Sequence, residues 1–115
     1  DVSRAHEVEM FPSVGTINTW IVINGELAEE AFIQSVITAT EAKTKAMAHE
    51  QVRDSRTGTL ATGTSTDSVL IAATQKGTPI EYAGPITEIG KKIGQGVFEC
   101  TVEAIQIYKK AKGWV

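Results

Sequence analysis

Apolar residues recur at helical spacing in two long stretches, and shorter β-branched and aromatic runs lie between them. Residues 26–50 carry apolar positions mostly three or four apart, and the stretch after Pro85 carries a second stripe. The first stripe comprises Leu27, Ala31, Val36, Ala39, Ala42, Ala46 and Met47, and the second Ile89, Ile93, Val97, Thr101, Ile105 and Tyr108. Residues 15–25 and 69–74 have strand composition, and residues 80–83 form a short extended piece. The pattern predicts an α/β fold (α+β is the alternative), a layered sheet-and-helix domain in the order strand, long helix, strand, short strand, long helix.

The first predicted strand is apolar on both of its faces from Trp20 onward. Its two alternating sets are Ile17, Thr19, Ile21 and Ile23 on one face and Asn18, Trp20 and Val22 on the other. Strands of this kind are typical of the middle of a parallel sheet, so we expect this one to be covered on both sides. A buried Asn18 would need hydrogen-bond partners, either in a neighbouring loop or on a substrate.

The second predicted helix contains three glycines. Pro85 suits the first helical position, because its missing N–H group is not needed there. Gly90, Gly94 and Gly96 lie inside the helix, where each glycine costs about 1 kcal/mol relative to alanine. We expect these positions to pack closely against a sheet or another helix.

Size and charge exclude several classes of protein. The chain has 115 residues, 42% of them hydrophobic and 22% charged, which is enough for a single domain with a core. The longest uncharged apolar stretch, residues 14–25, is shorter than the roughly 20 residues that span a bilayer, so we expect no membrane span. The net charge of −3 argues against nucleic acid as a partner.

Cysteine and histidine usage argues against a disulfide or a metal site. Cys100 is the single cysteine, and with only His6 and His49 it cannot frame a structural zinc site. We therefore expect no metal and no cofactor, and a reducing, cytoplasmic setting. The first fourteen residues show no period and open on Asp1, which suggests either a piece of a longer product or a trimmed start.

The stretch with the clearest potential for chemistry is the hydroxyl-rich segment 58–68. Thr62, Thr64, Ser65 and Thr66 surround a glycine and precede Asp67, directly before the second predicted strand. Hydroxyls and backbone amides can bind a carbonyl or a phosphate, and a carboxylate can act as a general base. The same residue types are common in structural turns, because their side chains bond to nearby backbone. Both interpretations stay open, and with them the alternative of a domain that binds a small-molecule phosphate.

Residues 38–44 offer a second candidate. Glu41 and Lys45 are four apart, in the order that favours an ion pair on a helix surface. Alternatively, Glu41 points into a cleft as an acid or base, with Lys43 or Thr40 beside it.

Four segments in order resemble the adenosylcobinamide amidohydrolase (CbiZ) family. They are residues 15–18 (GTIN) leading into an apolar strand, 38–44 (TATEAKT), 61–68 (ATGTSTDS), and 82–84 (YAG) followed by 87–90 (TEIG). Each motif is weak alone, whereas the ordered set, which covers residues 15–102, is fairly specific. The resemblance implies hydrolysis of an amide on the corrin side chain, which converts adenosylcobinamide into adenosylcobyric acid and an aminopropanol for coenzyme B12 synthesis.

The resemblance also implies a longer domain and a set of site residues. Family members are roughly twice as long, so the single domain 1–115 resembles a second half. The missing first half would then be a partner, in the same chain or as a separate one. At the motif positions of this chain, the catalytic candidates are Asp67, Glu41 and Thr64. The substrate-binding candidates are Asn18, Thr62, Ser65, Thr66 and Lys43.

Two further expectations follow from the resemblance. A pocket would lie between the hydroxyl-rich segment and the first long helix, with Asp67 and Glu41 as its acid–base pair. A non-catalytic corrinoid-binding or partner subunit is the alternative to an enzyme, and a homo-oligomer is left open.

Overall fold

The computed structural model describes residues 16–113, so the expectations for the first fourteen residues fall outside the described part. Its elements are β1 (Asn18–Ile23), β2 (Glu26–Leu27), α1 (Glu29–His49), β3 (Ser68–Ala73), β4 (Pro79–Ile80) and α2 (Glu88–Lys112). The mixed α/β class and the order strand, long helix, strand, short strand, long helix are therefore confirmed. The additional element, β2, is one that the sequence pattern missed.

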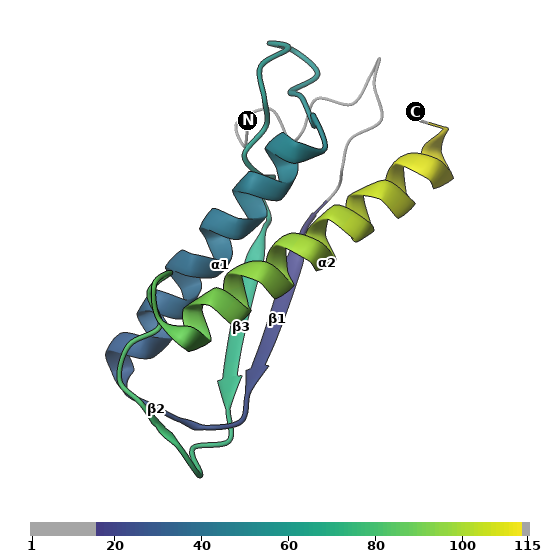
Figure 1. The fold of residues 1–115 in the computed structure, drawn as a ribbon. Helices are drawn as coiled ribbons and strands as arrows, with labels where there is room; N and C mark the ends of the chain where they lie inside the picture. The colour runs from purple at the N-terminus through teal and green to yellow at the C-terminus, as the bar shows by residue number, and fades with distance from the viewer. Residues whose placement is uncertain (1–15, 114–115) are drawn as a thin grey trace.

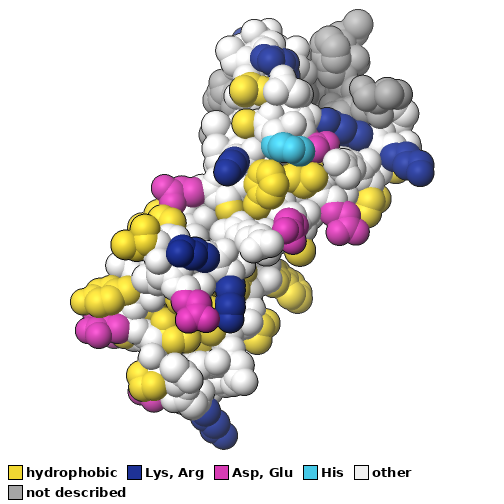
Figure 2. All heavy atoms as spheres, in the orientation of Figure 1, with side chains coloured by type: hydrophobic (Ala, Val, Ile, Leu, Met, Phe, Trp, Pro, Cys, Tyr) yellow, Lys and Arg dark blue, Asp and Glu magenta, His cyan; other side chains and the backbone are white. Residues whose placement is uncertain are grey.

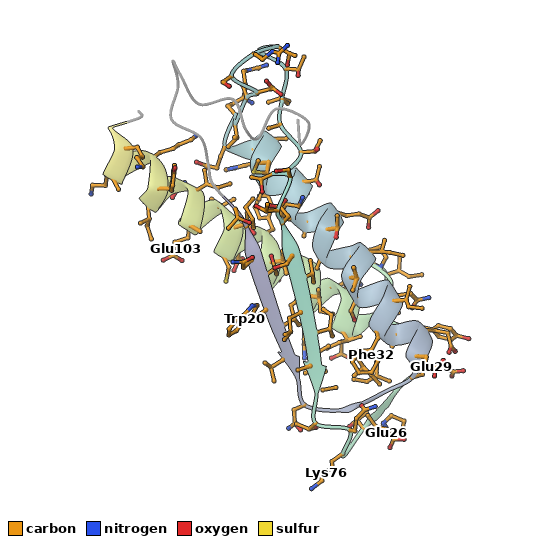
Figure 3. The ribbon with its side chains drawn as sticks, turned by 180° about the vertical axis from the view of Figure 1, so that it is seen from behind. Trp20, Glu26, Glu29, Phe32, Lys76 and Glu103 are labelled. Carbon is orange, nitrogen blue, oxygen red and sulfur yellow. The ribbon has the colours of Figure 1, made fainter. Side chains whose placement is uncertain are left out.

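The larger sheet in the described residues consists of β1 and β3, paired in parallel from Asn18↔Ser68 to Ile23↔Ala73. Parallel neighbours need a crossover connection, and α1 provides it. Both helices lie on the same face of this strand pair, in front of it in Figure 1 and behind it in Figure 3. The structure is thus a two-layer arrangement, with two helices over two strands.

The first helix begins three residues later than its pattern predicted. Glu26 and Leu27 pair in parallel with β4 instead, so the N–H of Glu26 donates to the Thr78 carbonyl and that of Ala28 to the Ile80 carbonyl. Both residues are compatible with a helix, and their partners lie about fifty positions away. Local propensity therefore gave no sign of this short strand.

The buried face of α1 is partly polar. Its buried residues are Ala31, Ser35, Thr38, Ala39, Ala42, Ala46 and Met47. Val36, predicted to belong to this face, is 41% exposed, because the buried stripe passes through Ser35 instead. The two buried hydroxyls form hydrogen bonds with backbone carbonyls: Ser35 donates to the Ala31 carbonyl at 2.7 Å and Thr38 to the Ala83 carbonyl at 3.0 Å.

The second helix begins at Glu88, and its cap differs from the prediction. Pro85 lies in the turn before the helix, and Thr87 is the N-cap, whose hydroxyl accepts from the Gly90 N–H at 3.0 Å. Gly90 alone of the three glycines is pressed against backbone: an added Cβ would lie 1.9 Å from the Gly84 carbonyl oxygen. Gly94 makes only an ordinary contact with Thr38, and a Cβ on Gly96 would meet nothing within 4 Å.

The core lies between the helices and the near face of the sheet. One cluster of buried residues includes Ile23, Leu27, Ala39 and Val97, and a second one at the far end of α1 includes Met47 and Ile105. On the face shown in Figure 2, acidic and basic side chains are interspersed among apolar ones, so that face carries no large patch of one sign. None of the helices in residues 16–113 combines the length and the apolar character that a membrane crossing requires.

The expectation that the first strand is covered on both faces is wrong for the described residues. The side chains of Trp20 and Val22 are each 76% exposed, and Leu70 on β3 is 48% exposed. Figure 3 shows Trp20 projecting from β1 on the side away from the helices. The strand has the composition of a sheet interior, and the part of the chain described here supplies no layer for its second face.

Candidate functional site

The segment between Thr62 and Ser68 is organised around the carboxylate of Asp67. Oδ1 accepts from the Thr64 hydroxyl at 2.5 Å and from the Ile17 N–H at 3.1 Å. Oδ2 accepts from the Thr64 N–H at 3.0 Å and from the Lys43 ammonium at 3.0 Å. One side chain thus joins the loop, the chain just before β1, and α1.

Lys43 reaches the loop from α1 and is itself little exposed. Its ammonium donates to the Thr62 carbonyl at 2.8 Å as well as to Asp67, and both side chains of the ion pair are less than one-fifth exposed. Gly63 lies against this pair, since an added Cβ would be 2.4 Å from Asp67 Oδ2 and 2.5 Å from Lys43 Nζ. A glycine is needed there because the ion pair occupies the space of a side chain.

These contacts fix the protonation state of the carboxylate. Burial alone would raise the pKa of Asp67, but the two hydrogen bonds from Thr64 and the hydrogen bond and charge of Lys43 outweigh it, so the net pKa lies below its usual value. Asp67 is therefore a firmly ionised group and a weak proton acceptor near neutral pH. This chemistry suits positioning of the loop better than general-base catalysis.

The motifs identified in the sequence meet in space. The Thr16 hydroxyl donates to the Thr66 carbonyl at 2.8 Å, and the Ser68 hydroxyl donates to Asn18 Oδ1 at 2.7 Å, which ties the start of β1 to the loop. Farther along α1, the Ala83 N–H donates to Gln34 Oε1 at 2.7 Å. The four segments are therefore joined to one another largely through hydrogen bonds to α1 and β1.

Four of the five predicted substrate-binding residues are exposed to solvent, namely Asn18, Thr62, Ser65 and Thr66. Ser65 and Thr66 are exposed at the tip of the loop. Neither hydroxyl has a hydrogen-bond partner among residues 16–113, whereas the Thr64 hydroxyl is buried against Asp67. The hydroxyls of Ser65 and Thr66, like that of Thr62, are thus within reach of a ligand.

Glu41 lies apart from this group. It is exposed on α1, two residues before Lys43, and a two-residue step rotates about 200° around a helix. Glu41 therefore faces away from the loop and from Asp67. It forms no ion pair with Lys45 in the described structure, and the Lys45 ammonium lies 5.6 Å from the ring centroid of Phe98.

A groove of about 850 Å³ runs between β1 and α2. It is lined by residues 16–24 and by one flank of α2 that includes Gly96, Cys100 and Tyr108. Asn18 is the predicted site residue that lines it; none of residues 62–68 and none of α1 does. This groove is therefore not the pocket expected between the hydroxyl-rich segment and the first long helix, where the ion pair of Lys43 and Asp67 joins the two elements.

The sequence interpretation missed this groove and a second polar cluster. The carboxylate of Glu50, just after α1, accepts from Gln106 at 3.2 Å and from His49 at 3.1 Å, and Lys109 lies 3.6 Å away. Burial alone would raise the pKa of Glu50, but these hydrogen bonds and the charges of Lys109 and His49 hold it below its usual value. The partners on α2 lie more than fifty residues away, so local spacing carried no signal.

Acidic, histidine and cysteine side chains do not gather anywhere between residues 16 and 113 in a group of three or more that could hold a metal ion. The groups that the loop presents are hydroxyls, backbone amides and one ammonium–carboxylate pair. Such groups bind carbonyl or other oxygen-bearing ligands by donating hydrogen bonds.

Comparison with known proteins covers nearly the whole chain. Residues 2–113 match the family described as CbiZ, adenosylcobinamide amidohydrolase. An adenosylcobinamide amidohydrolase of Methanosarcina mazei is 35% identical over 100 residues, which cover 79% of this chain and 46% of that protein. An uncharacterised protein of Methanocaldococcus jannaschii is 33% identical over 100 residues, with coverage of 86% and 39%.

The matched region thus covers less than half of each of these curated relatives. No solved structure matches it. The match over residues 2–113 and the two relatives above 30% identity show that the chain belongs to the adenosylcobinamide amidohydrolase family.

Proposed function

We propose that this chain takes part in the hydrolysis of adenosylcobinamide to adenosylcobyric acid and an aminopropanol, a step of corrinoid salvage toward coenzyme B12. The observation that carries the proposal is the family match over residues 2–113, supported by the relative that bears the name of this activity. Because the match covers only 39% and 46% of the two relatives, we propose that the chain is one part of the active enzyme.

Amide hydrolysis needs a nucleophile, a proton for the departing amine and donors for the oxyanion. We assign substrate contact to the Ser65 and Thr66 hydroxyls, because they are exposed and free to donate. Asp67, Thr64 and Lys43 are positioning residues in this scheme, since they satisfy one another and hold the loop. Thr62 contributes through its carbonyl, which anchors Lys43.

Asn18 has a separate role in the proposal. Its side chain accepts from Ser68 and lies where the loop meets the groove along β1, so its amide N–H₂ can bind a substrate amide that extends from the loop. Glu41 receives no role, because it faces away from all of these groups.

The test is an assay of the chain with adenosylcobinamide, alone and co-expressed with the portion of the Methanosarcina mazei protein that it does not match. We expect adenosylcobyric acid, detected by chromatography, only when both parts are present. The double variant Ser65→Ala/Thr66→Val should then lower kcat/KM by about 10²-fold or more, the scale of a lost oxyanion donor. Glu41→Gln is the matched control and should leave kcat/KM unchanged. Absence of product in both arms would contradict the proposal.

A second candidate function is corrinoid binding without chemistry in this chain. It is favoured by the saturation of Asp67, whose carboxylate already accepts four hydrogen bonds and is not free to act as a base on a hydroxyl of the loop. Titration with cobinamide, followed by absorbance, separates the two functions. Binding that the Ser65→Ala/Thr66→Val variant weakens, with no turnover when both parts are present, would establish a binding subunit.

A further inference from the structure

Strand β1 has a free edge whose direction follows from its pairing with β3. The carbonyls of Ile17 and Ile23 accept from the N–H groups of Ser68 and Thr74, so the odd-numbered residues of β1 point their backbone groups at β3. In a parallel pair, alternate residues point their N–H and C=O groups to opposite edges. The backbone groups of Asn18, Trp20 and Val22 therefore face the other edge, and no element of the described chain pairs with them.

The groove lies along this free edge, and the flank of α2 forms its other wall. Small residues recur every fourth position along that wall, at Gly96, Cys100 and Ala104, and all three are exposed. A wall of small side chains leaves room for a backbone to pass close to the helix. Unpaired N–H and C=O groups that repeat about every 6.6 Å along an edge can form hydrogen bonds with an added strand.

The open face of the sheet gives a second, independent indication. Trp20 and Val22 are both 76% exposed on the side away from the helices, where a parallel sheet is ordinarily covered. Figure 3 shows the Trp20 side chain projecting past β1 with no other element of residues 16–113 over it. Within the described residues, the free edge of β1 thus has no paired strand and its outer face has no covering layer. The opposite flank of α2, by contrast, is buried against α1.

We propose that a strand from the portion of the family's chain that this one does not cover pairs with the free edge of β1, inside the groove beside α2. The occupant is inferred from length: the two relatives extend well beyond the matched region, which is less than half of each. An added strand can form hydrogen bonds with the backbone groups of Asn18, Trp20 and Val22, because its own groups repeat at the same spacing. The amide groups of a corrinoid are scattered and do not match that spacing.

A second copy of this chain fits the edge less well. Two copies that pair β1 with β1 in antiparallel fashion are related by a twofold axis perpendicular to the sheet, which keeps both sets of helices on the same face. Each α2 flanks its own β1 edge, so the two helices would compete for the space above the shared edge. The proposal rests on family membership and not on the reaction.

Cys100 is a natural reporter of occupancy, because it is exposed, lines the groove and is the single cysteine of the chain. The tagged chain is co-expressed with the unmatched portion of the Methanosarcina mazei protein and purified. Iodoacetamide labelling of Cys100 is then followed by the intact mass of the 115-residue chain, in the complex and alone. We expect a one-to-one complex in which Cys100 is labelled at least about tenfold more slowly than in the chain alone.

Two variants and a control locate the contact. Val22→Pro removes an N–H that faces the free edge while leaving the ladder to β3 intact, and it should abolish co-purification. Val22→Thr keeps that N–H and the branched shape, and should retain the complex. Gly96→Leu fills the groove from α2, leaves β1 unchanged, and should also abolish the complex; circular dichroism verifies the fold of each variant.

Three results would overturn the proposal. The first is the absence of a complex. The second is a complex that survives Gly96→Leu and in which Cys100 is labelled as fast as in the chain alone. The third is a dimer of the chain alone in which Cys100 is protected from labelling. Because binding and labelling involve no turnover, the outcome is separate from that of the amidohydrolase assay.

Discussion

Asp67 accepts four hydrogen bonds, two from Thr64, one from Ile17 and one from Lys43. The sequence indicated that a carboxylate in a hydroxyl-rich loop would matter, and turn chemistry explains its bonds to Thr64. It could not indicate the bonds to Ile17 and Lys43, because these residues lie 50 and 24 positions away. The consequence is a loop held from three directions by one ionised side chain.

Asp67→Asn should lower the free energy of unfolding by about 1–3 kcal/mol, because the new amide N–H₂ would face the Thr64 N–H and the Lys43 ammonium. Lys43→Gln should have a smaller effect of the same sign. Urea denaturation of both single variants and the double variant forms a cycle. A coupling below about 0.5 kcal/mol would show that the pair is not linked as the structure describes.

Gly63→Ala should destabilise the chain by displacing the ion pair, since its Cβ would overlap Asp67 and Lys43. Gly84→Ala is the matched control: it has nothing within 4 Å of the added methyl group, and it should be neutral or slightly stabilising. Thermal unfolding of the two variants makes the comparison. Equal melting temperatures would contradict the tight fit at Gly63.

At the scale of elements, periodicity predicted the two long helices and composition predicted the two main strands. Their ends were less predictable: Glu26 and Leu27 pair with β4, which lies about fifty residues away, and Pro85 lies in a turn closed by the hydrogen bond from the Thr87 N–H to the Gly84 carbonyl. The buried stripe of α1 includes Ser35 and Thr38, which only hydrogen bonds to backbone make compatible with a core. A hydropathy pattern therefore selects Val36 in their place.

Within α2, glycine positions separate tight packing from free space. Gly90→Ala should destabilise the chain by more than 1 kcal/mol, because the methyl group would collide with the Gly84 carbonyl that anchors Thr87. Gly94→Ala should stabilise it by up to about 1 kcal/mol, since the neighbour on α1 is at an ordinary contact distance. Urea midpoints test both; destabilisation by Gly94→Ala would mean that the helices are closer than described.

At the scale of the whole molecule, the two-layer arrangement leaves a strand pair of interior composition with one open face and open edges. The sequence predicted a strand that is covered on both sides, and the described residues cover one side. That prediction failed because burial depends on what surrounds a strand, and more than half of each curated relative lies outside the matched region. The same missing context explains why no complete active site could be assembled from the sequence.

Acid should destabilise the whole molecule through two carboxylates. The pKa values of Asp67 and Glu50 are lowered in the folded chain, from the ordinary 3.8 and 4.5. Their contribution to stability is therefore complete above those ordinary values and is lost as the pH falls through the lower folded values. We expect the urea midpoint of unfolding to decrease as the pH is lowered from 4.5. The midpoint of the Asp67→Asn/Glu50→Gln variant should decrease less steeply over the same range. Parallel pH profiles for the two proteins would contradict this account.

The parallel pairing of β1 with β3 also has a consequence for folding during translation. Asn18 and its partner Ser68 are 50 residues apart, and translation adds about 5–20 residues per second, so β3 is made roughly 3 to 10 s after β1. During that interval the nascent polypeptide presents Trp20, Ile21 and Val22 to the crowded ribosome exit with no strand to receive them. Helix α1 is synthesised during that interval, but it packs mainly against α2 and β3, so β1 gains its neighbour only when β3 has been made.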